Sequence, residues 1–205
     1  MAAPIRERGA RRPVPILDDW RGRTLTWNNL YAFVGADAWE ANVTRYPSPI
    51  AQALTLFVVL APLVYHAIWG LRRIAVARPN NWSQPNYPNL KFLLQRLSAL
   101  GLLLFLGAHL WLALLRPRFV EGHAERFVDI AHQMHHHVPT LVVYLLGSLG
   151  VAYHLANGLE TALMKLGMRW PRRPWEPLER SFLLLFLILL AMSWAAIYAL
   201  YAAGA

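Results

Sequence analysis

The 205-residue chain contains no cysteine. That absence excludes a disulfide scaffold, thiolate metal sites, cysteine-ligated iron–sulfur clusters and a c-type haem attachment. Charge is also scarce, because only 15% of the residues are charged, whereas a soluble domain of this size carries about 25%. The low charge therefore argues against an ordinary soluble domain.

Hydrophobic residues make up 57% of the chain, and the formal net charge is +9. A basic balance is compatible with nucleic acid or with an anionic membrane surface as a partner. Nine Trp and eight Tyr in so charge-poor a chain favour the membrane, because these amphipathic rings sit at the level of the lipid headgroups. We therefore predict an integral protein of the lipid bilayer with no nucleic-acid partner.

Four apolar segments are long enough to cross a bilayer, since about 20 apolar residues in a helix span its core of roughly 30 Å. They comprise residues 49–70, 92–115, 138–160 and 181–205, and their central stretches lack Asp, Glu, Lys and Arg. Every backbone polar group in lipid must be paired within the chain, which leaves the helix as the spanning form for such segments. The sequence thus predicts an all-α membrane protein, with a transmembrane helical bundle of four spans over residues 49–205.

Residues 1–48 are expected to form a separate polar or interfacial segment. Within it, residues 25–39 (LTWNNLYAFVGADAW) are amphipathic and too short to cross, as is typical of a stretch that lies in the membrane interface. The basic start of the chain, IRERGARRP, leads into polar residues and not into an apolar run, so we predict no signal peptide.

The loops predict the orientation of the bundle. Residues 71–96 carry five basic and no acidic groups, residues 165–180 carry five basic and two acidic groups, and residues 116–137 carry three of each. The positive-inside rule places the first two loops in the cytoplasm and the third outside, which predicts a multi-pass protein of the inner (cytoplasmic) membrane. Residues 1–48 conflict with the rule, because four spans place their seven Arg outside.

Three histidines lie well inside the predicted spans. An ionisable residue at such a depth suggests function, because its burial in lipid is costly; a histidine that only hydrogen-bonds across a helix pair is about as common. His66 lies six residues, or roughly 9 Å, from the basic inner end of its span. His154 falls at a similar inner depth, whereas His109 lies thirteen residues, or roughly 20 Å, beyond Arg96.

Two histidines at one depth on different helices suit a metal or haem held by two imidazoles. Zinc would require three or four ligands, and the inner half of the spans supplies no carboxylate or thiolate, so haem b is the favoured cofactor. Small residues that leave room for a macrocycle lie on the second and third spans, at Gly101, Gly107, Gly147 and Gly150. Arg96, Arg72 and Arg73 at the inner rim are candidates to pair with haem propionates; for the last two, a role as positive-inside anchors is equally plausible.

The outer loop is rich in histidine. It contains His123, His132, His135, His136 and His137, and a short helix would place His132 and His136 on one face. Such a cluster could bind a divalent metal, relay protons or offer an axial ligand toward His109. A solvated or interfacial polar run is the simpler and favoured interpretation.

Three strings around these histidines resemble a known family. They are PLVYHAIWG (62–70), FLLQRLSALGLLLFLGAHLW (92–111) and YHLANGLETA (153–162). In this order they are similar to the cytochrome b membrane-anchor subunit of succinate dehydrogenases and fumarate reductases. The single-chain type found with menaquinone-using complexes matches best, over roughly residues 35–200.

The resemblance implies a bundle that normally has five spans and two stacked b haems. The inner haem would be held by His66 and His154, and the outer one by His109 together with a histidine from the family's first helix. No apolar helix precedes the matching region here, and residues 1–34 contain no His. Three explanations remain open: a small membrane subunit supplies the helix and ligand, the outer histidines substitute, or the outer haem is missing.

The resemblance also assigns residues near the inner haem. Arg96 and Ser98 match the family's entry to the second haem-bearing helix, although Ala99 stands where glycine is usual. Together with Gln95, they are inner candidates for delivering protons to a quinone. The outer candidates are Asp37, Glu40, Asp129 and the histidine cluster.

The same resemblance implies a subunit that is not catalytic alone. Its partners would be a flavoprotein subunit and an iron–sulfur subunit docked on the cytoplasmic face, and it would pass electrons to menaquinone or another quinone. Three alternatives belong to other classes: a cytochrome b subunit of a hydrogenase or formate dehydrogenase, a His-rich metal-ion transporter, and a structural anchor without haem.

Overall fold

The computed structural model of the chain describes residues 29–43, 49–77, 80, 83–123, 125–167 and 175–205. These ranges form helices and no strand. Four of the helices are long and apolar enough to cross a membrane, namely Thr55–Val76, Tyr87–Glu121, Val138–Lys165 and Arg180–Ala203. The predicted all-α membrane bundle is therefore confirmed.

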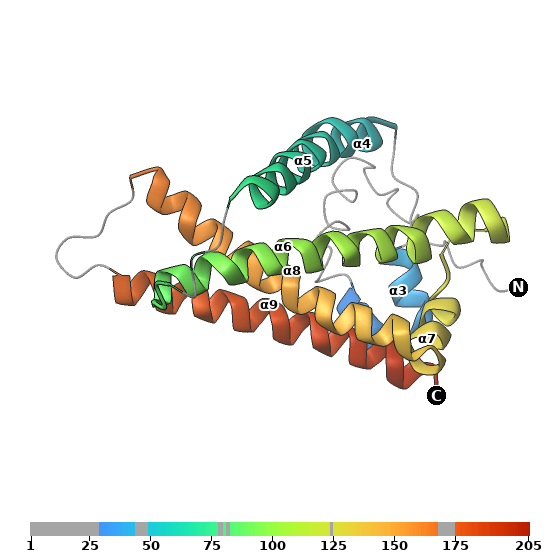
Figure 1. Ribbon diagram of the computed structural model, residues 1–205. Coiled ribbons are helices and arrows are strands. Elements are labelled where there is room, and N and C mark those ends of the chain that lie inside the picture. The colour runs from blue at the N-terminus through green and yellow to red at the C-terminus, as the bar shows by residue number, and fades with distance from the viewer. Residues whose placement is uncertain (1–28, 44–48, 78–79, 81–82, 124, 168–174) are drawn as a thin grey trace, which may run out of the picture.

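The centre of the bundle consists of three long helices that lie side by side (Figure 1). Helix α6 (Tyr87–Leu110) packs against α8 (Val138–Lys165), and α8 packs against α9 (Trp175–Ala203). Small residues of α8 allow the close approach. A Cβ atom at Gly150 would lie 3.2 Å from the Ser98 carbonyl oxygen on α6, and small residues at such contacts let membrane helices pack backbone to backbone.

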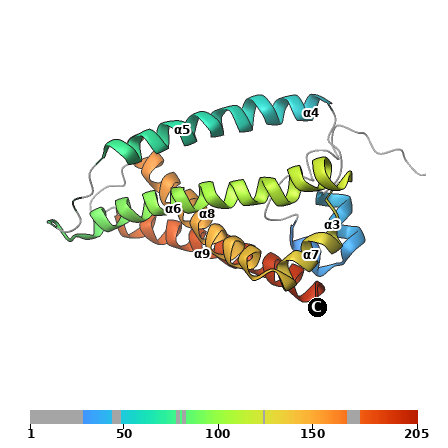
Figure 2. The ribbon, with the colours of Figure 1, turned by 45° about the vertical axis from the view of Figure 1, so that its right-hand side comes forward.

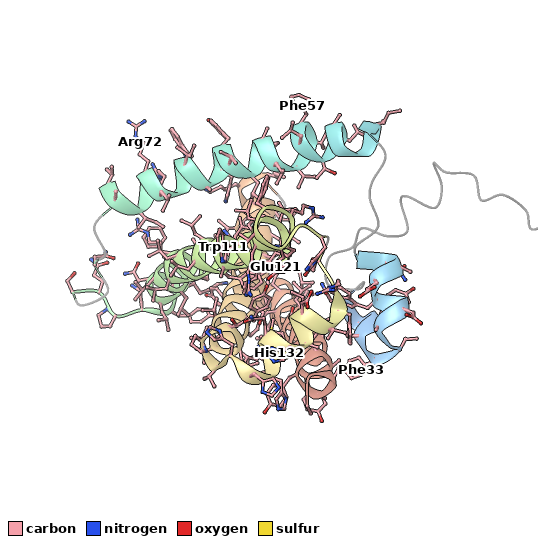
Figure 3. All side chains as sticks on the ribbon, turned by 90° about the vertical axis from the view of Figure 1, so that its right-hand side faces the viewer. Phe33, Phe57, Arg72, Trp111, Glu121 and His132 are labelled. Carbon is pink, nitrogen blue, oxygen red and sulfur yellow. The ribbon has the colours of Figure 1, made fainter. Side chains whose placement is uncertain are left out.

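The first span lies along one side of this three-helix centre (Figure 2). It is a continuous helix made of α4 (Pro49–Leu54), the π-helical turn η2 (Thr55–Leu60) and α5 (Ala61–Val76). Neither η2 nor α5 contains a buried residue, and Phe57 and Arg72 point away from the bundle (Figure 3). This helix thus offers most of its apolar surface to lipid.

The spans extend beyond the predicted boundaries. The first continues six residues past Gly70, to Val76, and the third continues past Glu160 to Lys165. The second runs on through Pro117 as the π-helix η3 (Trp111–Glu121) and ends where Gly122 adopts φ 75°. A wider π turn can accommodate a proline that lacks an N–H group, so the Arg116–Pro117–Arg118 stretch does not close the span.

A small core closes the outer end of the bundle, where η1 (Leu30–Phe33) and α3 (Ala36–Val43) meet α7 (Phe127–His136) and α9. Trp39 of α3 is 1% exposed, and its ring packs edge-on to Phe127 at 5.6 Å between centroids. The Glu40 carboxylate accepts a hydrogen bond from the Phe127 backbone N–H at 2.9 Å. The described part of the predicted N-terminal segment, residues 29–43, therefore packs into this core; the rest of that segment, residues 1–28 and 44–48, lies outside the described residues.

Candidate functional site

The two inner histidines meet between the first and third spans. His66 comes from α5 and His154 from α8, and their ring centroids lie 6.1 Å apart with an angle of 77° between the ring planes. The pairing predicted from their equal depth is thus present in the structure. The two rings are close enough to bind one metal centre between them.

An apolar cavity of about 90 Å³ adjoins this pair. Both histidines line it, and its remaining walls come from α5 and α6: Leu63, Ala67, Gly70, Leu71, Ile74, Ala99, Leu102, Leu103 and Leu106. Ala99 contributes a small side chain to this wall. The two imidazoles are the polar groups among these residues, so the site favours an apolar group that needs nitrogen ligands.

The Nδ1 atom of His154 faces α6. It lies 3.3 Å from the Gln95 carbonyl oxygen, 3.2 Å from the Gln95 side-chain amide nitrogen and 3.5 Å from the Ser98 hydroxyl oxygen. With its proton on Nδ1, the ring donates to the Gln95 carbonyl and keeps Nε2 unprotonated. This is the tautomer that a metal-binding histidine uses, since its other ring nitrogen normally donates to an oxygen acceptor.

Gln95 is itself held by α8. Its side-chain amide donates to the His154 carbonyl oxygen at 3.2 Å, and its Oε1 accepts from the Asn157 amide at 2.8 Å. Gly158 leaves the space, because a Cβ atom there would lie 3.3 Å from the Gln95 amide nitrogen. Asn157 is only 7% exposed and was missed from the sequence, although its place one turn after His154 is a signal for a shared face.

A buried ion pair extends these polar contacts between α6 and α8 toward the predicted inner end of the bundle. Lys91 Nζ lies 2.7 and 2.8 Å from the two carboxylate oxygens of Glu160, and Glu160 is 4% exposed. The Lys91 ammonium group on α6 compensates the charge of this buried carboxylate. The pair fixes the register of α6 against α8.

Arg96 belongs to α6, and its side chain reaches the end of α5. Its guanidinium donates to the backbone oxygens of Ala77 at 3.3 Å and Arg73 at 3.4 Å, and lies 4.2 Å from the centroid of the Phe92 ring. A cation close to the carbonyl groups at a helix C-terminus is favourable. Arg96 thus ties the end of α5, and with it the helix that carries His66, to α6.

His109 lies apart from the inner pair, near the outer end of α6. Its ring stacks on Phe105 at 5.7 Å with a 16° angle between planes. Its Nδ1 lies 3.1 Å from the hydroxyl oxygen of Tyr144 on α8. The ring contacts of His109 within the described ranges are to these two aromatic residues, so no histidine faces it there as His154 faces His66.

The outer histidines lie mostly on the short helix α7, as their spacing predicted. His132 and His136 have ring centroids 4.5 Å apart. The Nδ1 of His135 is 3.0 Å from the Tyr201 carbonyl oxygen, while the Nδ1 of His137 accepts from the Thr140 N–H at 3.3 Å and caps α8. The last two histidines therefore have structural partners at the ends of α9 and α8.

A second cavity, of about 480 Å³, opens at this outer end. In its wall, potential metal-ligand atoms of Glu121, His123 and Asp129 lie within 4.8 Å of one another. Both carboxylates are already paired, Glu121 with Arg116 at 2.9 Å and Asp129 with Arg126 at 2.8 Å. The two guanidiniums compete with a cation for these oxygens.

Glu125 also lines the outer cavity. Burial raises its pKa to about 7, and the nearby Arg118 guanidinium opposes that rise. This burial was not predictable from the sequence, because the polar composition of the outer loop is typical of a solvated segment.

Comparison with known proteins identifies a relative of the chain. No protein-family model matches the chain. The chain is 29% identical over 173 residues to the succinate dehydrogenase cytochrome b558 subunit of Bacillus subtilis (strain 168), covering 83% of this chain and 84% of that protein. The chain is thus similar to a succinate dehydrogenase cytochrome b subunit, and the resemblance identified from its sequence is confirmed.

Proposed function

We propose that the chain is the haem b-binding membrane anchor of a succinate–quinone oxidoreductase, through which electrons pass from an iron–sulfur subunit to menaquinone or another quinone. The observation that carries this proposal is the ring pair of His66 and His154 beside an apolar cavity. The similarity to a succinate dehydrogenase cytochrome b558 subunit supports the same assignment and favours it over a hydrogenase or formate dehydrogenase subunit.

The spacing of the two rings fits a haem iron. Nitrogen–metal bonds are about 2 Å long and a ring centre lies about 1 Å from its nitrogen, so two imidazoles on opposite sides of one metal have centres roughly 6 Å apart. The observed separation is 6.1 Å. The cavity itself is smaller than a porphyrin. The cavity is bordered by α5, a helix that buries no residue.

Haem b supplies one-electron transfer when it is bound by two histidines, and this ligation leaves no open iron position for oxygen. The protein binds and orients that group. His66 and His154 supply the ligand nitrogens, the Gln95 carbonyl holds the His154 proton at Nδ1, and the leucines of the cavity exclude water. Ser98, 8% exposed, supports the same nitrogen.

Arg96 is assigned two related roles at the inner rim. Its contacts to the backbone of α5 keep His66 close to α8. Its position at the cytoplasmic end of the span also suits pairing with a carboxylate of the haem, for which a planar guanidinium is well matched. Gln95, Ser98 and Arg96 form the inner group of candidates for proton delivery to a quinone.

The partners follow from the same proposal. The basic inner loops would face the iron–sulfur subunit and, through it, the flavoprotein subunit, with the chain itself in the inner (cytoplasmic) membrane. We assign His109 to an outer haem. His135 and His137 have structural partners of their own, so a second membrane subunit is favoured as the source of the ligand opposite His109.

The haem b content per chain in the purified complex tests this function, together with a redox titration of the reduced-minus-oxidised spectrum. One haem would support the inner site alone, and two haems with separate midpoints would support both sites. A fully assembled complex without haem would overturn the electron-transfer function and leave a structural anchor.

A further inference from the structure

His109 is held by a set of aromatic residues from two helices. Phe105, one turn earlier on α6, stacks on the imidazole, and Tyr144 of α8 packs edge-on against both rings. Tyr144 is 9% exposed, so its hydroxyl group is carried into the bundle and needs a hydrogen-bond partner there. The partner that it meets is Nδ1 of His109, at 3.1 Å.

The backbone of α8 is shaped to allow this arrangement. Gly147 lies three residues after Tyr144, and a Cβ atom at Gly147 would overlap the Phe105 side chain. Phe105 can therefore lie directly on α8, where it supports the His109 ring from one side while Tyr144 holds it from another. Three residues thus restrict the orientation of one imidazole.

The two ring nitrogens of His109 have different surroundings. Nδ1 meets the Tyr144 hydroxyl, whereas Nε2 has no hydrogen-bond partner within the described ranges of the chain. A histidine with only a packing role would be expected to use both nitrogens, because an unpaired polar atom in lipid is costly. A neutral imidazole that donates from Nδ1 instead presents Nε2 as a free ligand atom.

We propose that Tyr144 is a positioning residue for His109. Its hydroxyl oxygen accepts a hydrogen bond from Nδ1–H of His109, orients the ring and so keeps Nε2 available for the iron of an outer haem. This inference rests on the proposed function, since it assumes that His109 binds that haem. It adds a residue outside the three sequence strings that resemble the family.

The hydrogen bond has a predictable effect on a ligand. Donation from Nδ1–H to an oxygen raises the basicity of the opposite nitrogen, which favours ferric over ferrous iron. Removing the acceptor should weaken that preference. Loss of such an outer-shell partner typically changes metal affinity by about tenfold or more, and a tenfold change in the ferric-to-ferrous preference is equivalent to about 59 mV for a one-electron couple.

The test compares Tyr144→Phe with the wild-type complex by redox titration and low-temperature electron paramagnetic resonance. Tyr144→Phe keeps the ring contacts and removes the hydroxyl. We expect the outer haem to remain and its midpoint potential to rise by about 59 mV, which is equivalent to a tenfold change in the ferric-to-ferrous preference. We also expect its resonance to shift, because the imidazole gains rotational freedom. The matched control is Tyr198→Phe on α9, where the side chain is 65% exposed.

The inner haem reports folding in the same sample, because its ligands are unchanged. A shift confined to the outer haem supports the proposal. An unchanged outer haem in Tyr144→Phe, in a protein whose outer haem is lost in His109→Ala, would overturn the role of Tyr144 and leave the proposed function standing. A single haem that survives His109→Ala would also overturn it, while His66→Ala would still test the inner site separately.

Discussion

His66 and His154 are 88 positions apart in the chain, yet their ring centroids lie 6.1 Å apart. Outside this meeting point the two helices differ sharply in burial. α8 buries nine residues, whereas α5 buries none. The histidine pair therefore joins a firmly packed helix to one that is held loosely.

The loose packing of α5 predicts how the protein responds to haem removal. In a complex assembled under haem limitation, we expect amide hydrogen exchange to accelerate in α5 far more than in α8, because α5 would lose the group that links it to the bundle. Hydrogen exchange with mass spectrometry of haem-loaded and haem-depleted complexes measures this. Equal protection of α5 in both samples would contradict a haem between the two helices.

Breaking the buried ion pair should destabilise the bundle. Glu160→Gln leaves the Lys91 ammonium group without its carboxylate partner, and removal of one member of a buried pair costs about 3 kcal/mol or more. Thermal unfolding of the complex, followed by loss of haem absorbance, should show a clearly lower midpoint.

The matched control for that pair is Arg126→Met at the outer end. Arg126 and Asp129 form a pair in which Arg126 is 57% exposed, and such exposed pairs contribute little to stability because water screens them. The double variant Lys91→Met with Glu160→Met should recover most of the loss, because no unpaired charge remains buried. If Glu160→Gln were as stable as Arg126→Met, the packing of α6 against α8 would not depend on the pair of Lys91 and Glu160.

Trp39 should contribute strongly to the outer-end core. Its side chain is 1% exposed, and replacement of a buried Trp by Ala costs about 3–5 kcal/mol. Phe33, 58% exposed, supplies the control, for which Phe33→Ala should cost about 0.5 kcal/mol or less. Equal thermal midpoints for the two variants would show that α3 does not pack as described.

Glu125 predicts a pH dependence of stability. Its pKa rises from an ordinary 4.5 to about 7 in the folded protein, through burial and against the effect of Arg118. The folded state therefore holds this proton more tightly than the unfolded state, so stability should fall as the pH rises from about 4.5 to about 7 and level off above that range. The fall should be about 3 kcal/mol, since the pKa rises by about 2.5 and one pKa unit corresponds to about 1.4 kcal/mol.

Glu125→Gln removes the titrating group and should flatten this profile. Thermal midpoints of wild-type and variant complexes at several pH values between 5 and 8 provide the comparison. An identical slope in both proteins would mean that another group titrates, and that Glu125 is more solvated than its position in the outer cavity indicates.

Several features were predictable because they depend on local composition and helical spacing. Long apolar runs predicted the four spans, and equal depth predicted that His66 and His154 would meet. The helix ends were not predictable in this way, since a π-helical turn carries the second span through Pro117. Sequence spacing within one helix also gives no view of its neighbours, which is why the contact of Tyr144 with His109 and the burial of Glu160 by Lys91 emerged only from the packed structure.

Haem quantification in three single variants tests the central claim most directly. His66→Ala and His154→Ala should each abolish the same haem signal, identified by its midpoint and absorption maximum, while His109→Ala should leave that signal intact. Retention of this haem in either of the first two variants, in a complex that assembles normally, would contradict the account.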